Sequence, residues 1–133
     1  MKQRAPNFDQ AVSALIEDIY ERGLDRRVMV VVTGEFGRTP KISYVNGQPG
    51  RDHWPNATSM LFAGGGMRTG QVIGATDRQG AEVIERRIGV SDFLATIYRH
   101  LGVNTAGLEF HDFSGRPVPV PADGAPIAEL SRA

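Results

Sequence analysis

Residues 28–40 read Val-Met-Val-Val-Val-Thr-Gly-Glu-Phe-Gly-Arg-Thr-Pro, an apolar run that leads into a glycine and a carboxylate. β-Branched residues favour strands, and a short run that is apolar at every position is typical of a strand buried on both faces. In an open α/β sheet, ligands bind beyond the carboxyl ends of such strands. We therefore expect residues 28–32 to form a buried strand and the residues after it to form any functional site.

Two stretches of helical periodicity flank this part of the chain. Apolar residues recur every three or four positions from Phe8 to Tyr20, and Gly23 is placed to end the helix. A second helix is predicted to begin at Ser91, a residue type that caps helix N-termini, and to end before Gly102. Both stretches predict amphipathic helices that pack one face on a core.

A second apolar run and a long loop complete the predicted core. Residues 59–63 are predicted to form another buried strand, whereas residues 34–56 are rich in glycine, proline and polar side chains. The dipeptide Asn46-Gly47 within this loop favours a tight hairpin turn. Because a helix followed by a buried strand is half of a parallel unit, we expect an α/β fold with a mostly parallel sheet flanked by helices.

The whole chain has the size and charge of one small neutral domain. Its 133 residues fit a single domain, in which residues 104–133 form a proline-rich tail laid across a surface. It carries 15 lysines plus arginines and 15 aspartates plus glutamates, so no overall positive field attracts nucleic acid or an anionic membrane. We therefore expect neither of these partners, and any anion binding should be local.

Cysteine content and targeting signals narrow the functional classes further. The chain has no cysteine, which excludes disulfides, thiolate zinc sites and a cysteine nucleophile. Its first residues do not resemble a signal peptide, and no apolar run reaches the roughly 20 residues needed to span a bilayer. As given, the chain is expected in the cytoplasm, and a bound metal would need oxygen or imidazole ligands.

The loop between the two predicted strands carries the residues best suited to chemistry. Glu35 leaves the first strand, and Asp52 and His53 precede the second, so the returning loop should bring these side chains together. Carboxylates and imidazoles bind zinc, manganese, magnesium or calcium, which predicts a divalent metal site. Arg38 and Arg51 bracket the same loop and suit a tetrahedral oxyanion, such as that of an anionic ester ligand.

A structural interpretation of the same residues stays open. Asp52 and His53 could hydrogen-bond the loop backbone while Glu35 pairs with Arg38. No nucleophile is nominated, because no hydroxyl in the loop has an adjacent base.

Three further features favour structural roles. Residues 64–66 are glycines that could cradle a phosphate, but no Lys-Ser or Lys-Thr pair follows them as in a P-loop. His100 lies near the end of the second predicted helix, where a cation suits the helix dipole. Phe110 and Phe113 flank His111, and we expect these aromatic rings to anchor the tail.

Four motifs together point to a known family. They are Gly-Glu-Phe-Gly-Arg-Thr-Pro at residues 34–40, Gly-Arg-Asp-His-Trp-Pro at 50–55, Phe-Ala-Gly-Gly-Gly at 62–66 and Val-Ser-Asp-Phe-Leu-Ala-Thr-Ile at 90–97. In these motifs the chain resembles the carboxyl-terminal portion of a bacterial sulfatase-like domain-of-unknown-function family, the one numbered 1501. The resemblance runs from about Phe8 to Leu130 and implies a partial alkaline-phosphatase-like sandwich.

The resemblance also implies a reaction and its limits. In the alkaline-phosphatase-like superfamily, two metal ions at strand ends hold a phosphate or sulfate ester against a nucleophile. Glu35 resembles the aspartate of an Asp-His ligand pair, but Phe36 stands where the histidine would be, and His53 resembles a later histidine ligand. In an alternative alignment Asp52 and His53 are themselves the pair. The nucleophile and the first metal ligands have no counterpart before Phe8.

Two functions follow from these observations. The first is a sulfatase-like protein fragment with hydrolase ancestry that is not catalytic alone and covers its exposed sheet edges by forming a homo-oligomer. The alternative is a metal-dependent phosphate or sulfate ester hydrolase whose site is completed by another segment or subunit. Relatives of this type look exported, although no export signal is present here.

Overall fold

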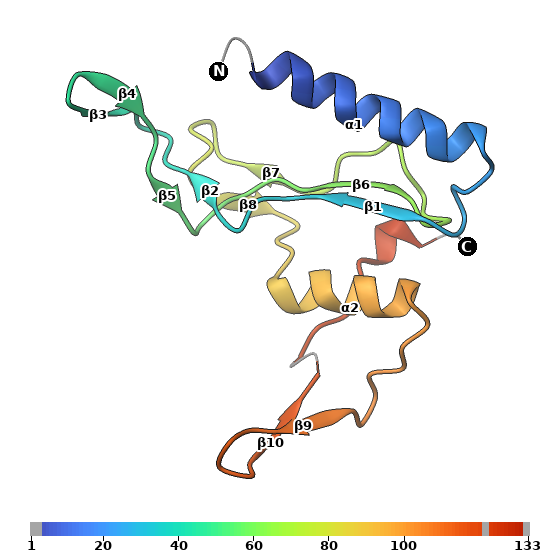
Figure 1. Ribbon diagram of the computed structural model, residues 1–133. Coiled ribbons are helices and arrows are strands. Elements are labelled where there is room, and N and C mark those ends of the chain that lie inside the picture. Colours follow the sequence, from blue (N-terminus) through green and yellow to red (C-terminus); the bar gives the residue numbers. More distant parts are fainter. Residues whose placement is uncertain (1–3, 121–122, 132–133) are drawn as a thin grey trace.

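The computed structural model describes residues 4–120 and 123–131 of the chain. In this part of the chain, two α-helices lie on either side of a central pair of strands, with smaller ribbons and hairpins around them (Figure 1). The elements are α1 (Arg4–Glu21), β1 (Met29–Val32), β2 (Gly37–Arg38), β3 (Ser43–Val45), β4 (Gln48–Gly50), β5 (His53–Trp54), β6 (Leu61–Gly64), β7 (Ala75–Thr76), β8 (Val83–Glu85), α2 (Val90–His100), β9 (Glu109–His111), β10 (Pro117–Pro119) and the 3-10 helix η1 (Ala128–Leu130).

Both predicted helices are confirmed, and each ends as its glycine indicates. After α1, the Gly23 N–H donates to the Tyr20 carbonyl and the Leu24 N–H donates to the Ile19 carbonyl, the paired bonds of a Schellman motif. Gly102 ends α2 with the same arrangement. The first turn of α2 differs from the prediction, because the N-cap residue is Gly89 and not Ser91.

The central strands form where the apolar runs predict them, but they are antiparallel. Strand β1 pairs with β6, with Val30 opposite Ala63 and Val31 opposite Phe62. Every other strand pair of the described residues is also a two-stranded antiparallel ribbon. The expected mostly parallel sheet of an alkaline-phosphatase-like sandwich is therefore wrong for this chain.

The path between β1 and β6 gives the physical reason for this correction. Parallel neighbours need a crossover, usually a helix, that carries the chain back to the starting end of the sheet. Residues 33–60 contain no helix; they fold into the ribbons β2–β5 and β3–β4 and turn the chain round at the far end. The next strand therefore runs back along β1 in the opposite direction.

The turn of the β3–β4 hairpin confirms the sequence prediction. Asn46 and Gly47 both have positive φ, 50° and 73°, which is the backbone of a type I′ turn. Farther along the chain, β7 pairs with β8 in a further antiparallel ribbon with a register shift at Ala75 and Thr76.

The two faces of the β1–β6 ribbon contact different layers. Phe62 points toward α2, where its ring lies edge-on to Phe93 with centroids 6.0 Å apart. Side chains alternate along a strand, so its neighbours Leu61 and Ala63 point to the opposite face, the side of α1. The chain is thus layered as α1, ribbon and α2, with the carboxyl-terminal segment beside α2 (Figure 1).

The hydrophobic core includes the end of the chain. Met67, Ile127 and Leu130 are buried together, and partly buried residues including Met29 and Phe62 pack against them. The proline-rich segment after residue 104 therefore supplies core residues near its end. The aromatic anchors proposed for this segment are wrong, because Phe110 is largely exposed and Phe113 fully exposed.

Candidate functional site

The loop that carries the predicted site closes on itself as a short antiparallel ribbon. Strand β2 pairs with β5, which places Arg38 opposite His53 and Gly37 opposite Trp54. A Cβ atom at position 37 would lie 1.7 Å from the Ala57 carbonyl oxygen, so only glycine fits there. The segment that leaves β1 and the segment that enters β6 therefore do meet, at the end of an antiparallel ribbon.

Aromatic stacking determines where the His53 imidazole lies. Its ring stacks on Phe36, with centroids 3.7 Å apart and planes inclined by 28°. The guanidinium carbon of Arg38 lies 5.3 Å from the centroid of the same phenylalanine, within the range of a cation–π contact. Phe36, the residue that cannot bind a metal, thus organises both of its polar neighbours.

The two arginines of the loop bind its backbone. Arg51 donates through Nη2 to the Arg38 carbonyl at 3.0 Å and through Nε to the Thr39 carbonyl. Arg38 donates through Nη1 to the Arg51 carbonyl at 3.3 Å. These bonds close the loop and engage part of each guanidinium within the chain.

The metal site at Glu35, Asp52 and His53 stays a prediction. Glu35, Asp52 and His53 are all exposed. Within residues 4–120 and 123–131, no three histidine, aspartate or glutamate side chains lie together as a metal site. The backbone of Asp52 is engaged, since its N–H donates to Thr39 Oγ1 at 3.0 Å.

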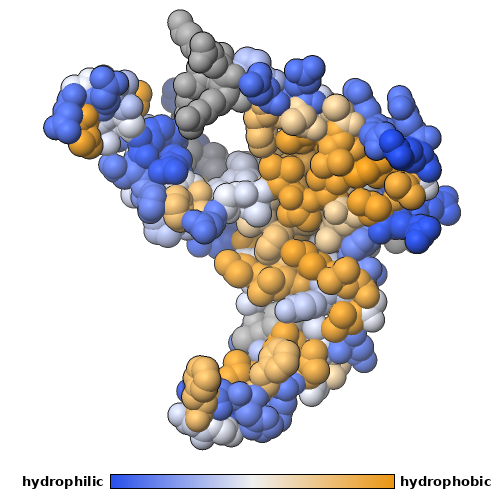
Figure 2. All heavy atoms as spheres, viewed as in Figure 1, coloured by the Kyte–Doolittle hydropathy of each residue, from blue (hydrophilic) through white to orange (hydrophobic). Residues whose placement is uncertain are grey.

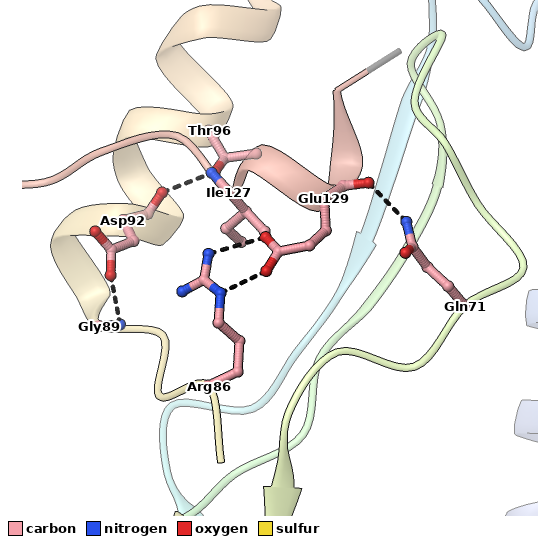
Figure 3. A network of polar contacts seen from close by, with 7 residues as sticks. All are labelled: Gln71, Arg86, Gly89, Asp92, Thr96, Ile127 and Glu129. Atoms are coloured by element: carbon pink, nitrogen blue, oxygen red, sulfur yellow. Dashed lines mark hydrogen bonds and ion pairs between the residues drawn. The ribbon is translucent and has the colours of Figure 1, made fainter. Parts of the chain in front are cut away.

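A second polar cluster ties the end of the chain to α2. The Asp92 carboxylate accepts hydrogen bonds from the N–H groups of Gly89 at 2.9 Å and Ala125 at 3.0 Å. The Thr96 hydroxyl donates to the Asp92 carbonyl at 2.8 Å and accepts from the Ile127 N–H at 2.9 Å (Figure 3). Thr96 is buried, so this hydroxyl satisfies a backbone donor inside the core.

An ion pair on the other side of the same segment completes the attachment. Arg86 donates through Nε to Oε1 of Glu129 and through Nη2 to Oε2, the second bond measuring 2.9 Å (Figure 3). Gln71 donates to the Glu129 carbonyl at 2.7 Å. The 3-10 helix is thus held from two directions while Ile127 and Leu130 enter the core.

The electrostatics of this cluster favour its charged form. Hydrogen bonds from the backbone of Ala125 and then Gly89 lower the pKa of Asp92 below its usual value. The hydrogen bond from Arg86 lowers the pKa of Glu129 and raises the pKa of Arg86 itself. The cluster therefore stabilises the fold while its carboxylates are ionised.

The glycine triplet has a packing role. The Gly65 N–H donates to the Val28 carbonyl at 2.7 Å, and the Gly66 N–H donates to the Asp25 carbonyl at 2.8 Å. A Cβ at Gly64 would lie 2.4 Å from the Val28 carbonyl oxygen. Because these donors are engaged within the protein, they do not form the phosphate cradle considered from the sequence.

Comparison with known proteins identifies the family. A family model described as "Protein of unknown function (DUF1501)" matches residues 1–131. The chain belongs to the DUF1501 family. No curated protein and no solved structure matches the chain significantly.

The DUF1501 chain contains no helix, among the residues described, that is long and apolar enough to cross a membrane. Its loop places Arg38 opposite His53 in the β2–β5 ribbon. The attachment of residues 124–131 to α2 was not predicted from the sequence. Thr96 gives no signal for it in the sequence, because it is not three or four positions from any of the apolar residues Leu94, Ile97, Tyr98 and Leu101.

Proposed function

We propose that this DUF1501 chain is an interaction module without a catalytic centre of its own, and that a second copy of the chain covers its open apolar face. The observation that carries the proposal is the half-covered apolar stripe of α1. Ile19, near the end of the helix, is 5% exposed, whereas Leu15 and Phe8 on the same stripe are 50% and 54% exposed. The chain therefore covers the apolar stripe at the end of α1 and leaves the rest of the stripe exposed.

The ribbon beneath α1 leaves the same face open. Leu61 points to the α1 side of β6 and is still 42% exposed. Apolar atoms gather over the region of α1, the central ribbon and α2 in the space-filling view, whereas the projecting β3–β4 hairpin is mostly polar (Figure 2). The face is thus continuous across the helix and the sheet.

The total exposed area is large for a chain of this size. The structure exposes 10299 Å² of surface. A compact monomer of 14.5 kDa exposes about 6,900 Å², so the excess is about 3,400 Å². Part of this excess belongs to the hairpins β3–β4 and β9–β10, which project from the body (Figure 1). A standard interface needs only about 800 Å² from each partner, so the area suffices for a stable dimer.

A second copy suits this face better than a charged partner would. The formal net charge is zero, so two copies do not repel one another. A two-fold axis would place the Phe8–Leu15 stripe of one copy against the same stripe of the other, a self-complementary helix packing. Burying the exposed half of each of these side chains contributes roughly 1 to 1.5 kcal/mol.

Sedimentation or light scattering at micromolar concentration tests the proposal. We expect a dimer for the parent chain and a shift to monomer for Leu15→Glu, which places a charge in the middle of the stripe. The matched control is Tyr44→Glu, which changes an exposed apolar residue on the β3–β4 hairpin. This variant should stay dimeric. A strictly monomeric parent chain, or equal dissociation of both variants, would contradict the proposal.

Metal-dependent hydrolysis of a phosphate or sulfate ester, completed by another segment or subunit, is the second candidate function. The motifs at residues 34–40 and 50–55 support a sulfatase-like relationship, and the contact of Phe36 with His53 brings these two motifs together. Metal analysis of protein purified without chelator tests this candidate. Stoichiometric zinc, manganese, magnesium or calcium that is lost in His53→Ala would support it.

A further inference from the structure

A cleft of about 720 Å³ lies at the end of the molecule away from the amino terminus of α1. Its walls come from the loop after α1, the glycine triplet, the last turn of α2 and the segment that contains η1. These elements converge near the carboxyl-terminal end of the chain (Figure 1). The volume is in the range typical of pockets for small molecules.

The cleft is lined by basic side chains from two different elements. Arg26 and Arg27 come from the loop after α1, and Arg99 and His100 come from the last turn of α2. No aspartate or glutamate of the described residues lines the cleft. The lining therefore concentrates positive charge in a chain whose formal net charge is zero.

The arginines of the cleft are not engaged by carboxylates of the chain. Among residues 4–120 and 123–131, the ion pairs involve Arg22, Arg86, Arg87 and Arg116. None of the cleft arginines belongs to this set. Near the end of α2, the carbonyls of Arg99 and Tyr98 already accept hydrogen bonds from the N–H groups of Gly102 and Val103. The guanidinium groups are thus free to bind an anion from solution.

The fourth basic group is held in position by the glycine triplet. A Cβ atom on Gly65 would lie 3.1 Å from Cε1 and 3.2 Å from Nδ1 of His100, so the imidazole packs directly against the glycine backbone. His100 is partly buried, unlike the three exposed arginines. The glycine triplet therefore does not bind the anion itself, but it fixes one of the groups that can.

We propose that this cleft binds a diphosphate group. A guanidinium presents a planar fork of donors that matches phosphate oxygens, and several such forks on separate walls suit a ligand with two linked phosphates. The inference does not rest on the proposed dimer, since Phe8 lies at the opposite end of α1, a helix about 27 Å long. Free pyrophosphate and a nucleoside diphosphate both carry this group.

Isothermal titration calorimetry with inorganic pyrophosphate, and separately with ADP, tests the proposal. We expect saturable binding of at least one ligand. Tighter binding of ADP identifies a nucleoside diphosphate as the ligand class, and binding of pyrophosphate alone identifies the free anion. Raising the salt from about 0.1 M to about 1 M shortens the screening length from about 10 Å to about 3 Å and should weaken binding strongly. If neither ligand binds, the proposal is overturned.

Variants separate a built site from general charge attraction. Arg27→Gln and Arg99→Gln should each weaken binding by roughly ten- to a hundredfold, the usual loss for a hydrogen bond to a charged group. Arg78→Gln, an exposed arginine in the turn between β7 and β8, is the control and should change affinity less than about twofold. Equal weakening by Arg78→Gln would overturn the proposal.

A measurement on the parent chain covers the case in which a variant fails to fold. Amide NMR spectra titrated with pyrophosphate should shift the signals of Gly65, Gly66 and Leu101, which line the cleft. Shifts confined to other parts of the chain would contradict the assignment of the site.

Discussion

Replacing Ile127 by alanine should destabilise the protein by about 3 kcal/mol, within the 2 to 5 kcal/mol typical of such buried truncations. Ile127 is 3% exposed and packs with Met67 and Leu130 in the core cluster. Its N–H is held by the Thr96 hydroxyl, so the backbone cannot easily move to fill the cavity. The loss of stability should therefore include the free-energy cost of a cavity in addition to the transfer free energy of the removed atoms.

This loss is large relative to the stability of a small domain. A chain of 133 residues typically unfolds with about 7 to 20 kcal/mol. Urea unfolding followed by circular dichroism at one protein concentration measures the change. With a denaturant slope of about 2 kcal/mol per molar urea, the midpoint should fall by about 1.5 M.

Phe113→Ala is the control for the same part of the chain. Its ring is larger than the isoleucine side chain but fully exposed, so its removal should change the free energy of unfolding by less than about 0.5 kcal/mol. The reasoning is refuted if Ile127→Ala unfolds at the parent midpoint, or if Phe113→Ala costs as much. The first result would mean that Ile127 is not part of the core, and the second that burial does not decide the cost of a truncation in this part of the chain.

Three other predictions concern the carboxylate cluster and the loop. The pKa of Asp92 is lowered in the folded state, so its contribution to stability is present above the unfolded pKa of about 4 and is lost as the pH falls through the folded pKa. Acid should therefore lower the urea midpoint less in Asp92→Asn than in the parent chain. Gly37→Ala should destabilise by roughly 1 to 3 kcal/mol in thermal unfolding, because its Cβ would collide with the Ala57 carbonyl, whereas Gly50→Ala, with open space around the Cβ, should be close to neutral. If the predicted metal site exists, adding metal back to the metal-free parent chain should raise its unfolding midpoint, and His53→Ala should abolish that increase. An unfolding midpoint that does not respond to metal would contradict the site.

Local patterns account for much of what the sequence predicts correctly. The three- and four-residue spacing from Phe8 to Tyr20 indicates α1, and the run of valines indicates β1. Asn46 and Gly47 tolerate positive φ, so they indicate the β3–β4 turn. Each of these features depends on residues close together in the chain, and the backbone preferences of those residues are sufficient to predict it.

The loop residues are an intermediate case. The sequence predicts that the segment after β1 returns close to its start, and the pairing of Arg38 with His53 agrees with this. The metal site at Glu35, Asp52 and His53 stays a prediction. The tertiary structure adds that His53 stacks on Phe36 and that Arg51 closes the loop backbone. Residue types alone do not indicate that His53 contacts Phe36 or that Arg51 binds backbone carbonyls.

By itself, the sequence determined the two α-helices, the extended segments of β1 and β6 and the tight turn at Asn46-Gly47. Only the tertiary structure decided that β1 and β6 run antiparallel, because strand direction depends on the path of residues 33–60 and not on the apolar pattern of either strand. It also decided that Ile127 and Leu130 complete the core. Two contacts hold their segment in place: Thr96 binds Ile127, 31 positions away, and Arg86 binds Glu129, 43 positions away. Contacts of that separation arise from packing, which a one-dimensional pattern does not encode.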